Sequence, residues 1–405
     1  MHEMLQNCKK IIKPLVPADL RRIIRRFQQQ LIVKPVIHAQ HTVTNARYEW
    51  GVALIGDMHC GSGLGEACRA NSQCLKYAQI PTQEVPMTNE ELSEFNSPYA
   101  VMLIHTNPDQ LNRVCSLIPK SQWTNRYIIG EWVWEQEKLP DWWLPYIELF
   151  DEIWTPSEFA ANAIRRVTEK TVRILPHAVE PQFDESWGRS AFGLPDGLFL
   201  CLIAFDYHSV LARKNPEGAI NAFCKAFSNC RTQVGLVIKT RNTPPEILRE
   251  LRTRLNGWPN VYFLTEDYSK NQVNSLIRAV DVYISLHRAE GFGLVLAEAM
   301  YLGTPVVATN WSGNTEFMNS EVACMVDAAP RILQKDELPF QKGSRWAEPD
   351  ENQAAEFLRK LFDQPEWRTE IAARAKEYIS TRLSVQSISE QMDEYLTEIR
   401  ENYKL

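Results

Sequence analysis

Two glutamates with seven residues between them, Glu290 and Glu298, mark the segment of this chain best suited to chemistry. Glu290 is followed by a glycine-containing turn, and a run of helix-forming residues begins at Leu294. Because the first N–H groups of a helix have no partner within the helix, such a turn favours a bound phosphate. One carboxylate in the turn and one in the helix can bind hydroxyls on either side of that phosphate. Sugar, diphosphate and ribose have this layout in a nucleotide sugar.

The stretch from Ala289 to Val307 resembles the signature of the family-4 retaining glycosyltransferases, E-G-F-G-x-x-x-x-E-A-M-x-x-G-T-P-V-V. The resemblance implies that Glu298 binds the ribose hydroxyls and that Glu290 binds the donor sugar. It also implies that backbone N–H groups hold phosphate or sugar oxygens at Gly291, Phe292, Gly293 and Leu294. The alternative is a buried strand–helix–strand unit whose glutamates face solvent, but that unit does not require the whole glycine and proline pattern.

A basic turn, Arg213-Lys214, follows an earlier apolar run. In the family, a lysine here and an arginine a few residues before it hold the donor diphosphate. Lys214 matches that lysine, whereas the earlier position holds His208 or Ser209, so Arg213 is the candidate second cation. Two cations would stabilise the charge that develops on the leaving diphosphate. The alternative is a solvated turn, and Lys239, at the end of a strand, is open to the same two interpretations.

A second glycine-rich segment, Gly61-Ser-Gly-Leu-Gly65, lies between a predicted strand and a predicted helix. By itself it resembles a weak dinucleotide fingerprint, for which Glu84 would be the acid that binds ribose. That interpretation predicts an NAD-dependent oxidoreductase. The family named above has the fold called GT-B. Many enzymes of that fold have a glycine loop at this place that approaches the donor, which would put Gly63 and Gly65 beside the donor. The second interpretation accounts for both halves of the chain and is preferred.

Polar and aromatic residues follow two other strands of the first half. Five of them are the candidates for the acceptor side of a cleft: His105, Asn107, Glu131, Trp134 and Glu135. Trp132, Trp142 and Trp143 lie nearby, and tryptophan rings either stack on sugars or fill a core, so both roles stay open. Retaining enzymes of this kind are thought to use the leaving phosphate as the base, so the resemblance requires no dedicated base.

No Asp-x-Asp motif occurs in the sequence, which argues against the metal-dependent class of glycosyltransferases. The predictions are therefore no metal site, no required cofactor, and a donor substrate that is a UDP- or GDP-linked sugar. His287 stands where the family usually has serine, which leaves the identity of the sugar open. An acidic chain of pI 5.9 is a poor partner for nucleic acid.

Short apolar runs alternate with amphipathic segments along most of the chain, which indicates parallel sheets covered by helices. The fold class is α/β, and the resemblance makes it GT-B, with two Rossmann-like domains across a cleft. Strands are predicted at 51–56, 99–105, 126–130, 152–155 and 172–175, then at 199–205, 234–239, 261–264, 281–286 and 306–309. The expected divisions are an extension at 1–45, domains at 46–182 and 183–375, and a helix at 376–405 that crosses back. The stretch 329–350 is expected to be an extended loop.

Residues 1–34 carry a net charge of +6 in a chain of net charge −6. Leu20, Ile23, Ile24 and Phe27 recur at helical spacing, with arginines between them, so residues 9–34 suit an anionic membrane surface. The alternative is a helix that packs on the protein body.

Nine scattered cysteines without a Cys-x-x-Cys pair indicate a reducing compartment. The predicted location is cytoplasmic, with peripheral attachment to the inner face of the plasma membrane as the membrane alternative.

The predicted activity is transfer of a hexose to a lipid-linked or polysaccharide acceptor, in bacterial surface glycan synthesis. Two rivals remain, the NAD-dependent oxidoreductase and a non-catalytic protein that binds sugar nucleotides or glycans. Absorbance changes of nicotinamide would reveal the first rival. Slow hydrolysis of the donor would exclude the second.

Overall fold

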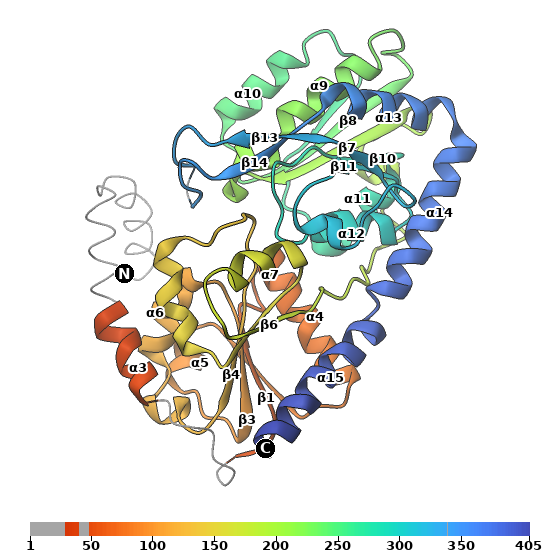
Figure 1. Cartoon of the computed structure of the whole chain (residues 1–405). Helices are drawn as coiled ribbons and strands as arrows, with labels where there is room; N and C mark the ends of the chain where they lie inside the picture. Colours follow the sequence, from red (N-terminus) through yellow and green to blue (C-terminus); the bar gives the residue numbers. More distant parts are fainter. Residues whose placement is uncertain (1–28, 40–47, 338) are drawn as a thin grey trace.

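The protein consists of two α/β units stacked on either side of a cleft (Figure 1). The computed structural model describes residues 29–39, 48–337 and 339–405. Each unit is built on a six-stranded parallel sheet with helices on its faces, which is the class that the alternation of apolar and amphipathic segments predicts.

The first sheet has the strand order β2-β1-β3-β4-β5-β6, and all its neighbours are parallel. Its strands are β1 (Glu49–Gly56), β2 (Thr82–Pro86), β3 (Tyr99–His105), β4 (Tyr127–Glu131), β5 (Glu152–Thr155) and β6 (Thr171–Ile174). Its helices are α4 (Gly63–Tyr77), α5 (Asn89–Ser93), α6 (Pro108–Leu117), η2 (Lys120–Trp123), η3 (Asp141–Leu149) and α7 (Glu158–Arg165). The strand order reverses between β1 and β3.

The second sheet reads β9-β8-β7-β10-β11-β12, the doubly wound order in which the first strand lies beside the fourth. Its strands are β7 (Phe199–Asp206), β8 (Val234–Arg241), β9 (Val261–Leu264), β10 (Val282–Ser285), β11 (Val306–Thr309) and β12 (Cys324–Val326). Its helices are η4 (Arg189–Phe192), η5 (Tyr207–Ser209), α8 (Leu211–Lys214), α9 (Pro216–Ala226), α10 (Pro245–Arg254), α11 (Lys270–Ala279), α12 (Leu294–Tyr301), η6 (Gly313–Glu316) and α13 (Glu351–Asp363). The order reverses between β7 and β10, and parallel sheets bind ligands beyond the carboxyl ends of such a pair.

The stretch 329–350 is not the extended loop that its composition predicts. It contains an antiparallel hairpin, β13 (Ala328–Ile332) and β14 (Arg345–Pro349), which pairs Ala328 with Pro349 and Ile332 with Arg345. The hairpin is mostly exposed along β13, so its sequence lacks the apolar run by which the buried strands are recognised.

The last two helices run along both units (Figure 1). Helix α14 (Pro365–Arg382) packs on α12 of the second unit, and α15 (Val385–Tyr403) packs on α4 of the first. Helix α15 buries Ile388, Met392, Leu396 and Ile399. The backbone N–H of Val179, in the earlier connection between the units, donates to the carbonyl of Leu383 at 2.7 Å. The two connections are thus bonded to each other.

The predicted basic helix lies mostly outside the described residues, which begin at Gln29. Its end is η1 (Gln29–Val33), followed by α3 (Lys34–Ala39). Val33 and Val36 are buried against the first unit, while Leu31 is 62% exposed. Within the described part of the chain, no helix is both long and apolar enough to cross a bilayer.

Candidate functional site

A turn between β10 and α12 presents Glu290 to the cleft. Gly293 ends the turn with φ +95°, a conformation that suits glycine. A β-carbon on Gly313 would come within 2.0 Å of the carbonyl oxygen of Gly291, so glycine is required there as well. The N–H of Glu290 donates to Ser312 Oγ at 2.8 Å, and the N–H of Gly313 donates to the carbonyl of Glu290 at 2.8 Å. This backbone is therefore held from both sides.

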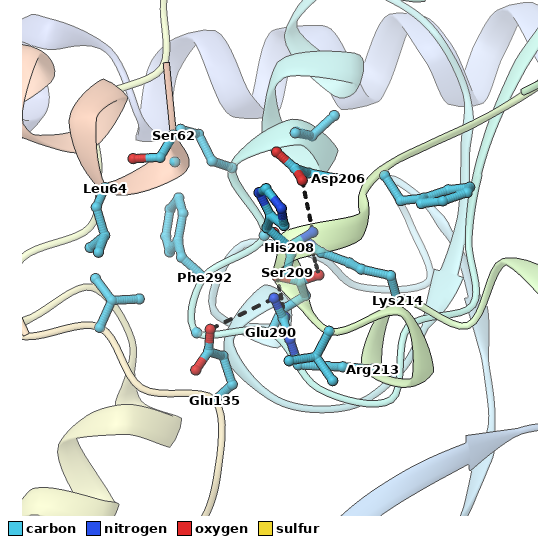
Figure 2. A pocket seen from close by; sticks show the side chains of 18 of the residues that line it. Ser62, Leu64, Glu135, Asp206, His208, Ser209, Arg213, Lys214, Glu290 and Phe292 are labelled. Carbon is cyan, nitrogen blue, oxygen red and sulfur yellow. Dashed lines mark hydrogen bonds and ion pairs between the residues drawn. The ribbon is translucent and has the colours of Figure 1, made fainter. Parts of the chain in front are cut away.

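Both predicted cations bind the carboxylate of Glu290. Lys214 Nζ donates to Oε1, and Arg213 Nη1 lies 3.1 Å from Oε2 (Figure 2). Arg213 Nη1 also donates to the carbonyl of Ala289 at 2.7 Å. Burial would raise the pKa of Glu290, but Lys214 and Arg213 outweigh it and hold that pKa well below its usual range. Burial lowers the pKa of Lys214, and Glu290 opposes this shift.

The basic turn takes its shape from two residues with positive φ on either side of α8. Val210 has φ +62°, which is strained for a β-branched residue, and Asn215 has φ +50°. The Asn215 side chain accepts from the N–H of Gly218 at 3.2 Å and donates to the carbonyl of Leu286 at 2.8 Å. Asn215 therefore begins α9 and ties the turn after β7 to the end of β10. These are the two strands between which the strand order reverses.

His208 and Ser209 line the cleft beside this turn (Figure 2). The N–H of His208 donates to Asp206 Oδ1 at 2.9 Å, so η5 is capped by the end of β7. The resemblance implies an arginine at about this position, but the chain has His208 and Ser209 there. Arg213 lies against Glu290 instead, at a different point of the same loop.

Glu298 lies in α12 and does not itself line the cleft; it is bound by a cleft-lining lysine that the sequence did not predict. Lys270 Nζ is 2.6 Å from both carboxylate oxygens of Glu298. Burial raises the pKa of Glu298, and Lys270 opposes that shift. Lys270 is the first residue of α11, whose capping box joins Ser269 and Gln272. That capping box, Ser-x-x-Gln after the loop that follows β9, is the sequence signal that could have placed Lys270 at this edge.

Lys239 lies in β8 and lines the cleft. Its Nζ donates to the carbonyls of Thr240 and Glu266, both at 3.1 Å, and lies 5.2 Å from the ring centre of Tyr268. Burial lowers the pKa of Lys239, while Asp267 and Glu266 oppose the shift. The solvated interpretation of this lysine is therefore wrong, since the residue is 7% exposed.

The glycine loop of the first unit begins α4 on the opposite wall of the cleft (Figure 2). Ser62 caps the helix by accepting from the N–H of Gly65 at 3.2 Å. A β-carbon on Gly65 would come within 2.2 Å of the carbonyl oxygen of Cys60, whereas one on Gly63 would meet open space. Gly65 therefore closes the turn, and Gly63 lines the cleft.

Glu84, the acid that a dinucleotide fingerprint would need, lies in the middle of β2. It accepts hydrogen bonds from Ser72 and Lys76 of α4 and does not line the cleft. The oxidoreductase interpretation therefore lacks its ribose-binding residue. No strand is predicted at this place, because β2 is an edge strand in which only Val85 is buried.

His105 and Glu131 do not face the cleft, contrary to the placement expected at their strand ends. His105 is 1% exposed and Glu131 is fully buried, with Nε2 and Oε1 3.3 Å apart. Glu131 also accepts a hydrogen bond from Asn71. Burial opposes ionisation of Glu131, but His105, His177 and Asn71 together outweigh it, so the pKa of Glu131 is lowered. These residues form a buried polar cluster beneath the cleft floor.

His177 connects this cluster to the cleft and was missed from the sequence. Its ring is centred 6.4 Å from that of His105 and 4.9 Å from that of Phe292, in the turn before α12. Burial lowers the pKa of His177 to about 4. His177 lies three residues beyond β6, so its position after a strand was the available signal.

The remaining acceptor-side candidates lie at the cleft. Asn107 forms two hydrogen bonds of 2.9 Å with the backbone of Val133 and so fixes the loop that carries Trp134 and Glu135. Glu135 Oε1 lies 3.8 Å from Arg213 Nη2 across the cleft (Figure 2), and burial raises the pKa of Glu135. Trp132 is a core residue, and Trp134 is 2% exposed.

The cleft between the two units measures about 1830 Å³. Its second-unit wall includes Arg213, Lys214, Glu290 and the N-terminal turn of α12. Among the described residues, no group of three or more histidine, cysteine, aspartate or glutamate side chains is placed to hold a metal ion. Such a wall can bind an anionic ligand through charge and backbone N–H groups together.

Comparison with known proteins agrees with this architecture. Residues 202–378 match the protein family described as Glycosyl transferases group 1. A D-inositol 3-phosphate glycosyltransferase of Acidothermus cellulolyticus is 31% identical over 38% of this chain and 37% of its own length. A trehalose synthase of Rubrobacter xylanophilus is 23% identical over 72% of this chain and 68% of its own length. The chain thus spans little more than a third of the first of these relatives.

A solved structure of Anabaena HepE in complex with UDP and glucose superposes with a TM-score of 0.61. That comparison covers 86% of this chain and all of HepE at 15% identity, so it shows the fold. The fold is GT-B, as the resemblance in the sequence implies. The family match lies mostly in the second unit, and the structural comparison shows the GT-B fold for both units.

Proposed function

We propose that this protein is a retaining glycosyltransferase that moves a hexose from a nucleoside-diphosphate sugar to a lipid-linked or polysaccharide acceptor. The observation that carries the proposal is the joint binding of Glu290 by Lys214 and Arg213, where the strand order reverses between β7 and β10. The HepE complex, which contains UDP and glucose in the same fold, supports a nucleotide-sugar donor. Whether the donor carries UDP or GDP is the first question for experiment.

In this proposal the diphosphate lies against Lys214, Arg213 and the N–H groups of the turn before α12. As the bond to the sugar breaks, negative charge grows on the leaving diphosphate, and fixed cations stabilise that charge most. Glu290 orients both cations and faces the sugar, while Glu298 binds the ribose hydroxyls. Gly63 lies across the cleft, where its backbone can approach the donor. The leaving phosphate takes the proton of the acceptor, on the face where the acceptor attacks.

The proposal includes independence from metal ions, because the two cations supply the positive charge that a divalent ion would otherwise supply. It also places the protein in the family-4 group, on the residues from Ala289 to Val307 that match its signature. A role in bacterial surface glycan synthesis is consistent with a lipid-linked acceptor.

The binding of nucleotides gives the direct test. We expect UDP or GDP at about a hundred times its Kd to stabilise the fold by about 2.7 kcal/mol, a shift of a few degrees in Tm. Glu298→Gln should weaken that nucleotide about tenfold or more, since it loses a charged hydrogen bond to ribose. Thermal-shift titrations measure both effects.

Glu351→Gln is the matched control, because Glu351 pairs with Lys225 at 3.0 Å away from the cleft. It should leave nucleotide affinity unchanged. If neither UDP, GDP nor any UDP- or GDP-linked sugar stabilises the wild-type protein, the proposed function is wrong. If Glu298→Gln binds as tightly as the wild type, only the assignment of Glu298 fails.

We also propose that residues 9–34 bind an anionic membrane surface and bring the protein to its acceptor. The described end of this segment is η1, and α3 follows it. These two elements contact α6 and η3, and both α6 and η3 contribute residues to the cleft lining. Such an anchor would place the membrane near the acceptor side. Each arginine on the surface should contribute about 1 kcal/mol, and salt should weaken the attraction.

Co-sedimentation with phosphatidylglycerol vesicles tests this proposal. Removal of residues 1–28 is the suitable truncation, because Val33 and Val36 are buried in the body of the protein and should be retained. We expect the truncated protein to fold and to lose vesicle binding at low salt. An intact protein that does not bind these vesicles at low salt would refute the membrane proposal.

A further inference from the structure

The hairpin β13–β14 extends from the second unit, and its connecting loop reaches the first (Figure 1). Phe340 lies in this loop and is 2% exposed. Its ring is centred 5.6 Å from that of Trp134, in the first unit, and 5.5 Å from that of Trp346, in β14. Phe340 thus belongs to the apolar core of the first unit, together with Trp143. The described residues of this loop, 333–337 and 339–344, are called loop 333–344 below, and this contact seats them across the cleft.

The base of the hairpin is joined to the residues that bind Glu290. Arg288 donates to both carboxylate oxygens of Glu348 in β14, at 3.1 and 2.8 Å. The N–H of Ala347 donates to the carbonyl of Arg288 at 2.9 Å. The N–H of Arg288 in turn donates to the carbonyl of Arg213 at 2.8 Å. The loop is therefore fixed relative to the proposed donor site as well as to the first unit.

The loop has an internal structure of its own. The backbones of Glu337 and Phe340 exchange two hydrogen bonds of 2.9 Å, and the N–H of Lys342 donates to Asp336 Oδ1 at 2.8 Å. A further ion pair joins Arg345, where the loop ends, to Glu137 of the first unit. These bonds join the described residues of the loop to one another and to the first unit.

The space beneath this loop has the lining of a sugar site. The loop contributes Asp336, Pro339, Gln341 and Lys342 to the cleft wall, and the first unit contributes Asp109, Asp141 and Trp142. Trp142 is only partly buried and stacks edge-on against Trp143, at 6.0 Å between ring centres. An aromatic face packs on the C–H face of a sugar, and carboxylates and amides accept or donate to its hydroxyls. The charged residues among these are three aspartates and one lysine, a balance that favours a neutral ligand over an anionic one.

We propose that loop 333–344 and Trp142 form a subsite for an uncharged sugar residue of the acceptor. The acceptor is then already a glycan at the point of attack, and not a bare lipid phosphate. This inference rests on the proposed glycosyltransferase function. Trp142 binds the acceptor in this view, and Phe340 is a positioning residue that seats the loop against Trp134.

A glycan array of neutral oligosaccharides, probed with the wild-type protein with and without saturating UDP or GDP, tests the subsite directly. We expect binding to neutral glycans, and Trp142→Ala should weaken the best of them about tenfold or more, which corresponds to about 1.4 kcal/mol. Phe340→Ala should weaken it similarly, and Phe340→Leu should restore part of the loss. Lys335→Ala is the control, because Lys335 is in the same loop, is 81% exposed and does not line the cleft.

The best array glycan then serves as the acceptor in transfer assays. The loss in Trp142→Ala should appear as a higher KM for that glycan, without loss of the thermal shift produced by the nucleotide. Absence of glycan binding by the wild type would overturn the subsite, as would an unchanged KM in Trp142→Ala. Efficient transfer to undecaprenyl phosphate, with a KM that neither variant alters, would overturn it too. Failure of the wild type to bind any nucleotide or nucleotide sugar would instead refute the proposed function. In that case the array without nucleotide would still test whether the subsite binds a neutral glycan.

Discussion

Replacing Lys214 with alanine should lower the turnover of sugar transfer about a hundredfold. Its ammonium binds Glu290 in the cleft and, in the proposed reaction, faces the diphosphate as charge develops on it. Loss of one preorganised donor to a developing oxyanion costs about a hundredfold to a thousandfold in turnover. The KM for the donor should change less, because the interaction strengthens in the transition state. Steady-state kinetics with the nucleotide sugar identified by thermal shift measure the effect.

Lys225→Ala is the control for this lysine, since Lys225 also pairs with a glutamate but lies on α9 away from the cleft. It should have wild-type kinetics. Excess EDTA should likewise leave wild-type turnover unchanged, because the cations are the protein's own. Loss of activity with EDTA that manganese or magnesium restores would contradict the metal-independent part of the proposal. Normal turnover in Lys214→Ala would contradict the site assignment itself.

Glu290→Gln is expected to lower turnover by about tenfold to a hundredfold while the protein stays folded. The substitution keeps the size of the side chain but removes the charge that Lys214 and Arg213 share. A charged hydrogen bond contributes about 1.5–3 kcal/mol, and here the loss falls on the sugar and on the orientation of both cations. Since the pKa of Glu290 is held well below its usual range, the effect should be the same from pH 6 to pH 8.

Glu351→Gln again serves as the matched variant, and its pair with Lys225 lies outside the cleft. The two variants should differ in turnover but not greatly in Tm. If Glu290→Gln had wild-type turnover and affinity, Glu290 would be a structural partner of the two cations and nothing more. If Glu290→Gln lowered only the affinity for the nucleotide, Glu290 would contribute to binding of the diphosphate and not of the sugar.

Most of the buried strands could be predicted from the sequence because their residues are apolar over the whole run, but β12, a buried strand of three residues, is too short to be recognised in this way. β3 and β7, for example, are predicted with nearly the bounds that the structure has. The exposed strands could not be predicted in this way. β13 buries almost none of its residues, and β2 buries only Val85, so neither leaves an apolar run in the sequence.

Local segments of the site could be predicted, and contacts between distant segments could not. The turn from Glu290 to Leu294 is continuous in the chain, and its shape follows from its glycines. Lys270 and His177 reach the site from other elements, so no spacing in the sequence connects them to Glu298 or Phe292. His105 ends a strand as expected, but a strand end does not decide whether a side chain points up to the cleft or down into the core.

The crossing of α15 has a consequence for the order in which the protein is made. A ribosome completes the first sheet about two hundred residues before it delivers Ile388, Met392 and Leu396, which cover α4. Until then the apolar face of α4 lacks its partner, so the first half cannot reach its final packing during synthesis. A premature stop after Arg382 would therefore damage the unit that was translated first, and leave the sheet of the unit translated last with its own strands intact.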